Sequence, residues 1–417
     1  MKGNTFSATG ALLGLVLIRT PVVQFINVFF DGARRVEDSS GRSVWVSSGN
    51  VGSAVGVLLS LLIAVLALHI LFSRSSLHQE RTTMPAAQLM GMLGITLAFA
   101  TLIRDDNRNF LSIAVAVLVI AALAFGAPSE IRPRQLAVIA VAILMSVLIY
   151  QIVFYQDAVA ECRIDKCSPF GGLWHSYLPQ ENNLGLLVAT LVPLLAFLGR
   201  RKTRWFALGI ALALLVGSGS RTAQLMAVVA YLGYLLIRNN ENYMQSPRST
   251  LRAFLRSVPL LSIIASVIIM LESQLNLFTN RGDIAQIVLR GFREEPVFGP
   301  GRSILYRAYE ERVTGRYILV HEHGQLPYLM TNVGIVGCIF FFLILAAWIS
   351  SKSLHPLSIA LFSTVAVGFV TEPMWEINVA TPYFWTLALW LVILRLSSQR
   401  AKVQSVDKPA NSARPVW

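Results

Sequence analysis

Charged residues are scarce in this chain. They make up 14% of its 417 residues, while 55% are hydrophobic, and the mean hydropathy is +0.60. Because a soluble domain usually carries about 25% charged residues, this composition excludes an ordinary soluble globular protein. Acidic residues are scarcer than basic ones, with 22 aspartates and glutamates against 35 lysines and arginines. The sequence therefore predicts a membrane protein with a basic excess.

Three further patterns are missing. The apolar runs do not alternate with a period of two, which excludes a barrel of transmembrane strands. Phe29-Phe30-Asp31 follows the first run where a signal peptide would have small residues, so this run predicts a retained helix. The chain also has no internal repeat, and this disfavours transporters built from duplicated halves.

The apolar runs predict an all-α polytopic membrane protein. A membrane-spanning helix needs about 20 mainly apolar residues, and we expect about twelve such helices, although Arg19 and Pro21 weaken the first run. The predicted spans are residues 9–30, 51–72, 85–103, 109–126, 135–156, 182–199, 204–217, 221–237, 254–272, 326–349, 355–371 and 381–397.

Lysines and arginines gather in every second connection, which predicts that these connections and both termini are cytoplasmic. Residues 1–273 would then hold the first nine helices, and residues 326–397 the last three. Between them, residues 274–325 would form one long, partly helical extracytoplasmic loop. Residues 398–417 would form a basic cytoplasmic tail.

The net charge of +13 does not indicate a nucleic-acid partner. The basic residues are dispersed over many loops and form no patch with interleaved aromatic residues. Instead, they are placed where anionic lipid headgroups attract lysine and arginine. The partner that this charge predicts is the membrane lipid itself.

The chain has three cysteines. Cys162 and Cys167 lie in one predicted extracytoplasmic loop, where a disulfide is the favoured interpretation. Free thiols are an alternative, and a metal site is a weaker one, because no histidine partners lie nearby in the sequence. Cys338 falls in an apolar run, and this position predicts that its side chain packs among apolar neighbours.

Polar residues mark the outer ends of several predicted spans. Asn182 and Asn183 open the sixth span, where their amides would cap a helix or hydrogen-bond a sugar or phosphate. The turn Gly217–Ser220 joins the seventh and eighth spans and leaves Arg221 at a helix N-terminus. That position suits an anion such as phosphate. The alternative is an arginine that reaches to lipid headgroups.

The stretch from Asn280 to Gly337 contains seven arginines and no lysine. A guanidinium binds phosphate oxygens in pairs, although the six acidic residues of this stretch also permit a salt-bridged surface. Its apolar spacing predicts one helix over residues 284–292 that lies on the bundle or at the interface, and a second over residues 302–313. His321 and His323 follow; a general base, a structural role and a metal ligand all stay open for them.

Four motifs in this order resemble the bacterial O-antigen ligase and O-antigen polymerase superfamily. They are Gly217-Ser-Gly-Ser-Arg221, Arg281 with Pro296-Val-Phe298-Gly299-Pro-Gly301, His323 with Leu326 and Leu329, and Gly334-Ile-Val-Gly337. The match covers roughly residues 175–340. The chain departs from the family where Gly324 follows the histidine and where Ala285 lies four residues after Arg281.

The resemblance implies a metal-independent, inverting glycosyltransferase of the bacterial inner membrane that needs no cofactor. The donor would be a glycan on undecaprenyl diphosphate, and the acceptor a sugar hydroxyl on a lipid-anchored glycan. Arg221 and Arg281 would bind the diphosphate, and His323 would activate the hydroxyl. Asn182, Asn183 and His321 would be further substrate-binding residues. Ligase and polymerase activity are not distinguished.

A transporter or flippase of lipid-linked oligosaccharides is the main alternative, since many helices and basic residues suit it equally well. Such a protein should have charged residues or broken helices at the middle of the membrane. The predicted polar residues instead gather at one face. A non-enzymatic assembly scaffold is a third interpretation, but it does not explain why these motifs recur in family order.

Overall fold

The structure is a computed structural model. Most of its described residues are helical, and the strands form only short hairpins, so the prediction of an all-α protein is confirmed at this level. The described residues are 7–37, 43–46, 49–72, 85–104, 110–126, 133–162, 166–178, 180–240, 249–271, 281–301, 324–351, 354–376 and 383–394.

The predicted spans correspond to helices throughout the described residues. Each of the twelve ranges overlaps one helix, with two exceptions: α5 and the first two residues of α6 (Tyr155–Ala158) fall in the fifth, and α7 and the 3-10 helix η3 share the sixth. The helices of the bundle are α1 (Ala8–Phe29), α2 (Val51–Phe72), α3 (Pro85–Arg104), α4 (Phe110–Phe125), α5 (Pro133–Val153), α7 (Glu181–Leu191), η3 (Val192–Phe197), α8 (Arg201–Ser218), α9 (Arg221–Asn240), α10 (Ser249–Leu271), α13 (Gln325–Ser350), α14 (Pro356–Gly368) and a last helix, Phe384–Leu394.

Two short hairpins and one helix lie outside these spans, and a second short helix lies at the end of the fifth. Strand β1 (Arg34–Glu37) pairs antiparallel with β2 (Ser43–Val46), and β3 (Val159–Ala160) pairs with β4 (Leu173–Trp174). The pattern of hydropathy did not predict either hairpin. The helices are α6 (Tyr155–Ala158) and α11 (Arg281–Glu294).

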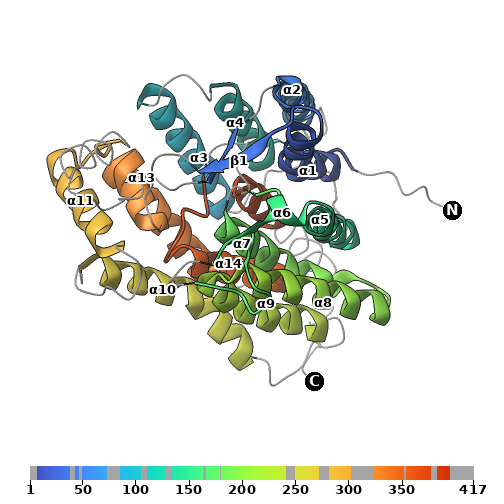
Figure 1. The fold of residues 1–417 in the computed structure, drawn as a ribbon. Coiled ribbons are helices and arrows are strands. Elements are labelled where there is room, and N and C mark those ends of the chain that lie inside the picture. The colour runs from blue at the N-terminus through green and yellow to red at the C-terminus, as the bar shows by residue number, and fades with distance from the viewer. Residues whose placement is uncertain are drawn as a thin grey trace, which may run out of the picture.

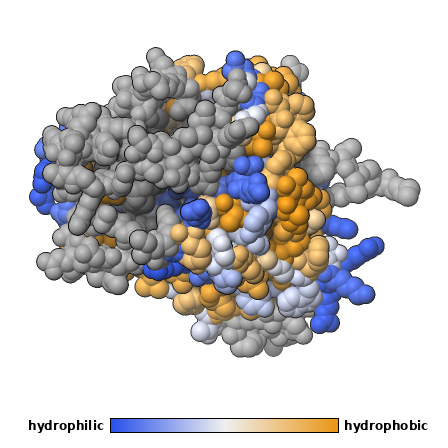
Figure 2. Space-filling view, in the orientation of Figure 1, coloured by the Kyte–Doolittle hydropathy of each residue, from blue (hydrophilic) through white to orange (hydrophobic). Residues whose placement is uncertain are grey.

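Among the described residues, five helices are long and apolar enough to cross a membrane. They are α1, α2, α5, α13 and residues Thr250–Leu271 of α10. Large apolar side chains are exposed along them, among them Leu58, Leu61 and Val65 of α2. Figure 2 shows hydrophobic residues spread over the face to which α1, α2 and α5 belong. Because such a surface suits lipid and not water, these features are those of a helical membrane protein.

Helices α1 and α2 pack closely through small residues. Gly52, Gly56 and Ser60 are buried along one face of α2, at the spacing of four residues that lets helices approach in a membrane. Arg19, only 8% exposed in the middle of α1, donates from Nε to Ser60 Oγ at 2.9 Å. Helix α1 therefore runs unbroken through Arg19 and Pro21, the residues that weakened the sequence prediction.

The centre of the bundle is built from the C-terminal part of the chain. All residues from Leu357 to Gly368 of α14 are buried, and so is the whole last helix. Figure 1 shows α14 and α7 in the middle of the ribbon, and α14 packs against α9 and α10. Phe362 of α14 stacks on Trp390 of the last helix at 4.6 Å between ring centroids, and Trp375 lies next to both rings, at 6.0 and 5.3 Å. This aromatic stack joins α14 to the last helix.

Helix α11 confirms the predicted apolar stripe of the long loop. Its residues Ile284 and Val288 are buried against Met270 of α10 and against Leu326 and Met330 of α13. The stripe therefore lies on the bundle, which was one of the two predicted positions. The second predicted helix, residues 302–313, falls outside the described residues.

The turn that follows α11 docks into a break in helix α13. Gly334 leaves the helical conformation at φ 63° and ψ −149°. Beyond the break, Ile335 N donates to Pro296 O at 2.8 Å, and before it Thr331 O accepts from Gly301 N at 2.8 Å. The docked turn, residues 296–301, thus supplies partners for backbone groups that the break releases from the helix.

Glycine is required at Gly334 by two independent constraints. Its positive φ is unfavourable for residues with a side chain. A Cβ atom would also lie 2.5 Å from both Gly299 N and Val297 O, and 2.6 Å from Pro296 O. Backbone atoms cannot move aside as a flexible side chain could. The docked turn and α13 can therefore meet only if position 334 has no side chain.

We expect Gly334→Ala to lower the free energy of unfolding by at least about 2 kcal/mol, because strain and overlap with the docked turn add. Thermal unfolding in detergent, followed by tryptophan fluorescence, measures this loss. Gly209→Ala in α8 is the matched control, since a Cβ there meets nothing within 4 Å. An unchanged melting temperature of Gly334→Ala would contradict the docked arrangement.

Candidate active site

Polar side chains gather at one end of the bundle, where α7, α9 and α13 begin and α14 ends. Lys166 Nζ lies 3.1 Å from Glu181 Oε1 and 2.8 Å from Asn182 Oδ1. The amide of Asn182 donates to Glu372 Oε1 at 3.3 Å. Both side chains of the Lys166–Glu181 pair are 10% exposed, so the opposite charges neutralise each other largely out of water.

Two more hydrogen bonds close the same end. The Tyr383 hydroxyl donates to Asn183 Oδ1, and Thr371 Oγ1 donates to Thr222 Oγ1 at 3.0 Å. Segments that are distant in the sequence are thereby held together. We call this group the polar end; its members are Lys166, Glu181, Asn182, Asn183, Thr222, Thr371, Glu372 and Tyr383.

Asn182 and Asn183 were predicted to cap their helix or to bind substrate, and the capping interpretation is wrong. The N-cap residue of α7 is Gln180, and both asparagines lie inside the first turn. Their side chains point to other segments instead, Asn182 to Lys166 and Asn183 to Tyr383. The two amides therefore belong to the polar end as hydrogen-bonding groups.

Arg221 is the first residue of α9, as predicted, and it is exposed. The chain turns before it at Gly219, which has φ 61°. Gly217, at the end of α8, lies against the ring of Trp174, where a Cβ would come within 2.3 Å of a ring carbon. Arg221 directly precedes Thr222, whose hydroxyl joins the polar end, so this arginine lies at its edge.

The start of α13 is anchored to the loop that carries Glu372. Gln325 N donates to Phe369 O at 2.8 Å, and Gln325 Oε1 accepts from Trp375 N at 2.9 Å. Gly324, at φ 99°, leaves room for this contact, because a Cβ would lie 3.1 Å from the oxygens of Phe369 and Val370. The chain therefore enters α13 beside the polar end.

The structure describes the remaining predicted site residues only in part. His321 and His323 lie outside the described residues, and so does the side chain of Arg281, although Arg281 is the first residue of α11. Gln286, in the next turn of α11, donates to Met270 O at 3.2 Å, which ties this helix to the end of α10. The roles of the two histidines and of Arg281 stay predictions.

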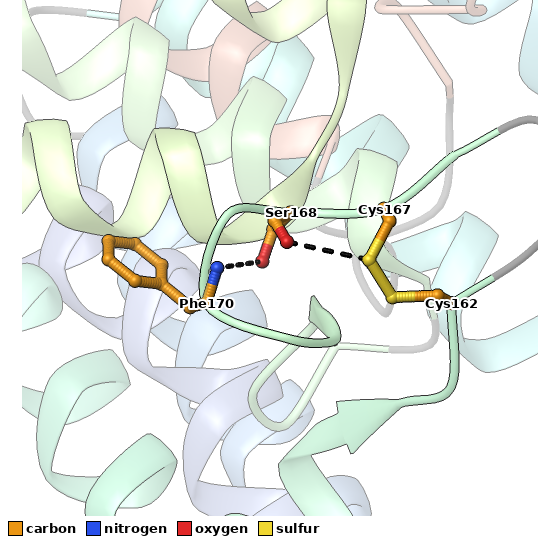
Figure 3. Close-up of a disulfide and its surroundings, with 4 residues drawn as sticks. All are labelled: Cys162, Cys167, Ser168 and Phe170. Carbon is orange, nitrogen blue, oxygen red and sulfur yellow. Dashed lines mark hydrogen bonds between the residues drawn. A yellow bond between two sulfur atoms is a disulfide. The ribbon is translucent and has the colours of Figure 1, made fainter.

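A disulfide joins Cys162 and Cys167, which confirms the favoured interpretation of these cysteines. Figure 3 shows the bond beside a tight turn, in which Phe170 N donates to Ser168 Oγ at 3.2 Å. The closed ring contains Lys166, whose ammonium group reaches the polar end. The disulfide therefore restricts where Lys166 can lie.

The segment after the disulfide is folded into the bundle. His175 is fully buried, and its Nδ1 lies 3.2 Å from the carbonyl oxygen of Leu178. Ser176 Oγ donates to Val147 O of α5 at 3.1 Å. Burial also raises the pKa of Tyr177 to about 12, so its hydroxyl stays protonated at neutral pH. These contacts give Lys166 and the disulfide a rigid support.

Sequence reasoning missed Lys166, Glu372 and Tyr383. Lys166 lies between two cysteines, and the pattern there was interpreted only through the cysteines. Tyr383 lies within a predicted span. Glu372 comes directly after the eleventh apolar run, and this position could have singled it out. However, a charged residue at a helix end is usually interpreted as exposed to water. Only its burial, with 4% exposure, sets it apart.

The resemblance implies an enzyme that needs no metal, although a metal ligand was one interpretation of His321 and His323. Within the described ranges, no group of three or more histidine, cysteine, aspartate or glutamate side chains lies close enough to hold a metal ion. His321 and His323 are not part of that comparison, so the absence of a metal stays a prediction. The groups that the structure describes at the polar end are hydrogen-bonding side chains and one pair of opposite charges.

No protein-family model matches the chain, and no curated protein is significantly similar to it. The likeness of its motifs to the O-antigen ligase and polymerase superfamily therefore stays a prediction. The function has to be argued from the geometry of the polar end and from the chemistry of the residues around it.

The disulfide makes a direct prediction about thiol counts. In denaturant without a reducing agent, a maleimide reagent should label one cysteine per chain, Cys338, because the other two are bonded. After reduction it should label all three. Mass spectrometry counts the labels, and a Cys338→Ser variant should change from none to two. Three labels before reduction would contradict the disulfide.

The Lys166–Glu181 pair predicts energetic coupling. Lys166→Met and Glu181→Gln should each lower the free energy of unfolding, since each leaves a buried charge without its partner. The double variant should lose less than the sum, with a coupling between about 0.5 and 3 kcal/mol. Unfolding in detergent measures all three variants. Simple additivity would mean that the pair contributes nothing to the fold.

Proposed function

We propose that the chain is an integral-membrane glycosyltransferase of the bacterial inner membrane, with about twelve spans and both termini in the cytoplasm. The polar end would then face the extracytoplasmic side. The donor is a glycan on undecaprenyl diphosphate, and the acceptor is a sugar hydroxyl of a lipid-anchored glycan. The product is a longer or transferred polysaccharide.

One observation carries the proposal. Segments that the sequence singled out separately meet at one end of the bundle: the start of α7 with Asn182, the start of α9 with Arg221, and Gly324, which follows His323 in the chain. They meet around the loop of Glu372. Asparagine and glutamate side chains are suitable partners for sugar hydroxyls, and an arginine at a helix N-terminus suits a phosphate.

The reaction can be written as one displacement. The acceptor hydroxyl oxygen attacks the anomeric carbon of the donor sugar, and the bond from that carbon to the phosphate oxygen breaks. His323 takes the proton of the hydroxyl, and undecaprenyl diphosphate leaves with the bonding electrons. Arg221 and Arg281 stabilise the negative charge that develops on the leaving diphosphate. A single displacement inverts the anomeric carbon.

Transport of lipid-linked oligosaccharides is the second candidate, because two observations favour it. Helix α13 is broken at Gly334, and Arg19 is buried in the middle of α1, both features of transport proteins. However, the docked turn supplies hydrogen bonds at the break, and Arg19 donates to Ser60. Both features therefore have hydrogen-bond partners within the protein, so they favour transport less than they would if they were unpaired.

Arginine and histidine variants test the proposed transfer. In membranes supplied with lipid-linked donor and acceptor, Arg221→Ala, Arg281→Ala and His323→Ala should each reduce transfer by about 100-fold or more, because charge stabilisation or proton uptake is lost. The donor should accumulate. Gel analysis of the labelled glycan measures both. Addition of EDTA should leave wild-type transfer unchanged.

Matched controls come from the same helices. Arg238→Ala removes an exposed arginine at the opposite end of α9, and Arg290→Ala removes an exposed arginine of α11. Both should keep wild-type transfer. Full activity of His323→Ala would refute its role as the base. If wild-type protein in vesicles moves the donor across the membrane without lengthening its glycan, the transporter interpretation replaces this one.

A further inference from the structure

Glu372 belongs to the polar end, and the proposed displacement assigns it no task. Its carboxylate is buried, with 4% exposure, and accepts a hydrogen bond from the Asn182 amide at 3.3 Å. Its neighbour Thr371 is bonded to Thr222, the residue after Arg221. Glu372 therefore lies close to Arg221, the proposed phosphate-binding residue.

A carboxylate is a poor partner for the diphosphate. Its negative charge would repel the phosphate oxygens and weaken the attraction of Arg221 for them. It is, however, a strong acceptor for a neutral O–H donor, because hydrogen bonds to a charged oxygen are stronger than neutral ones. Among the groups of a lipid-linked glycan, a sugar hydroxyl meets this description.

Gln325, at the start of α13, offers the complementary donor next to the loop of Glu372. Its side chain is fully buried, and its Oε1 accepts from Trp375 N, but its Nε2 has no hydrogen-bond partner among the described residues. A buried donor without a partner is unfavourable, and a ligand oxygen would satisfy it. A sugar hydroxyl both donates and accepts. It can therefore donate to a carboxylate while an amide donates to it.

We propose that Glu372 and Gln325 bind hydroxyl groups of a sugar at the polar end, Glu372 as acceptor and Gln325 as donor. The inference rests on the proposed glycosyltransferase function and names the residues that hold the sugar apart from the diphosphate. The same chemistry is present in the donor glycan and in the acceptor glycan. Kinetics with each substrate varied separately distinguishes these two sources.

Glu181 supplies the matched control, because it belongs to the same charge network. It pairs with Lys166, which also contacts Asn182, the residue that bonds Glu372. If Glu372 only balanced charge in this network, Glu181→Gln and Glu372→Gln would have the same consequences. If Glu372 binds sugar, only its own substitution should weaken the binding of one substrate alone.

The experiment measures initial rates of transfer for wild type, Glu372→Gln and Glu181→Gln in native membranes. Acceptor is varied at saturating donor, and donor at saturating acceptor. Glu372→Gln should raise one KM by about tenfold or more and leave the other unchanged, since a charged hydrogen bond in the bound complex is lost. Glu181→Gln should lower the melting temperature without raising the KM of one substrate selectively, because it disturbs the Lys166 network as a whole.

The result identifies the source of the sugar. A raised acceptor KM assigns the hydroxyl to the acceptor glycan, and a raised donor KM assigns it to the donor glycan. Unchanged KM values for Glu372→Gln, or the same change in Glu181→Gln, would overturn the inference and make Glu372 a structural residue.

A binding measurement separates this inference from the proposed function. Free glycan, released by mild acid from the undecaprenyl-linked oligosaccharide of the native membrane, is titrated onto purified protein in detergent, and binding is followed by calorimetry. Weaker binding to Glu372→Gln than to wild type and Glu181→Gln supports the sugar site even if wild type shows no transfer. Equal binding to all three proteins refutes it.

Discussion

Helix α13 is interrupted at Gly334, and the backbone groups released there must find partners inside the protein. In the interior of a membrane, an unpaired backbone N–H or C=O costs several kcal/mol, because no water is present to replace the lost hydrogen bond. The docked turn supplies these partners from outside the helix. If the turn left α13, these backbone groups would lose their hydrogen-bond partners. The segment that follows α11 is therefore tied to the bundle.

The same helix connects this joint to the polar end. Helix α13 starts at Gln325, which is bonded to the loop of Glu372, and it breaks at Gly334, where the turn docks. Helix α11 lies between them, with Ile284 and Val288 buried against the first turns of α13. Helix α13 thus supports both the described parts of the long polar stretch and the proposed site.

Charge neutralisation holds the polar end together as packing holds the core. The Lys166 ammonium donates to Glu181 and to Asn182, and the Asn182 amide donates to Glu372. Opposite charges removed from water stabilise a site only when each has a partner of good geometry. The disulfide of Cys162 supports this arrangement, because it restricts the loop that carries Lys166.

Local pattern was enough for the helices, for the apolar stripe of α11 and for the disulfide, since each depends on residues within a few positions of one another. It was not enough for the partners of Asn182 and Asn183. These side chains bond Glu372 and Tyr383 across 190 and 200 positions of sequence, and Thr371 bonds Thr222 across 149. Periodicity contains no information about such distant pairs.

By itself, the sequence determined an all-α protein of many apolar helices, because hydropathy and helical spacing act over one or two turns of chain. It also located Arg221 at the start of a helix. The tertiary structure decided which helix ends meet, that Glu372 is buried among them, and that Gly334 receives the docked turn. The reason is physical: which buried polar groups become neighbours depends on how the helices pack, and packing is a property of the whole chain.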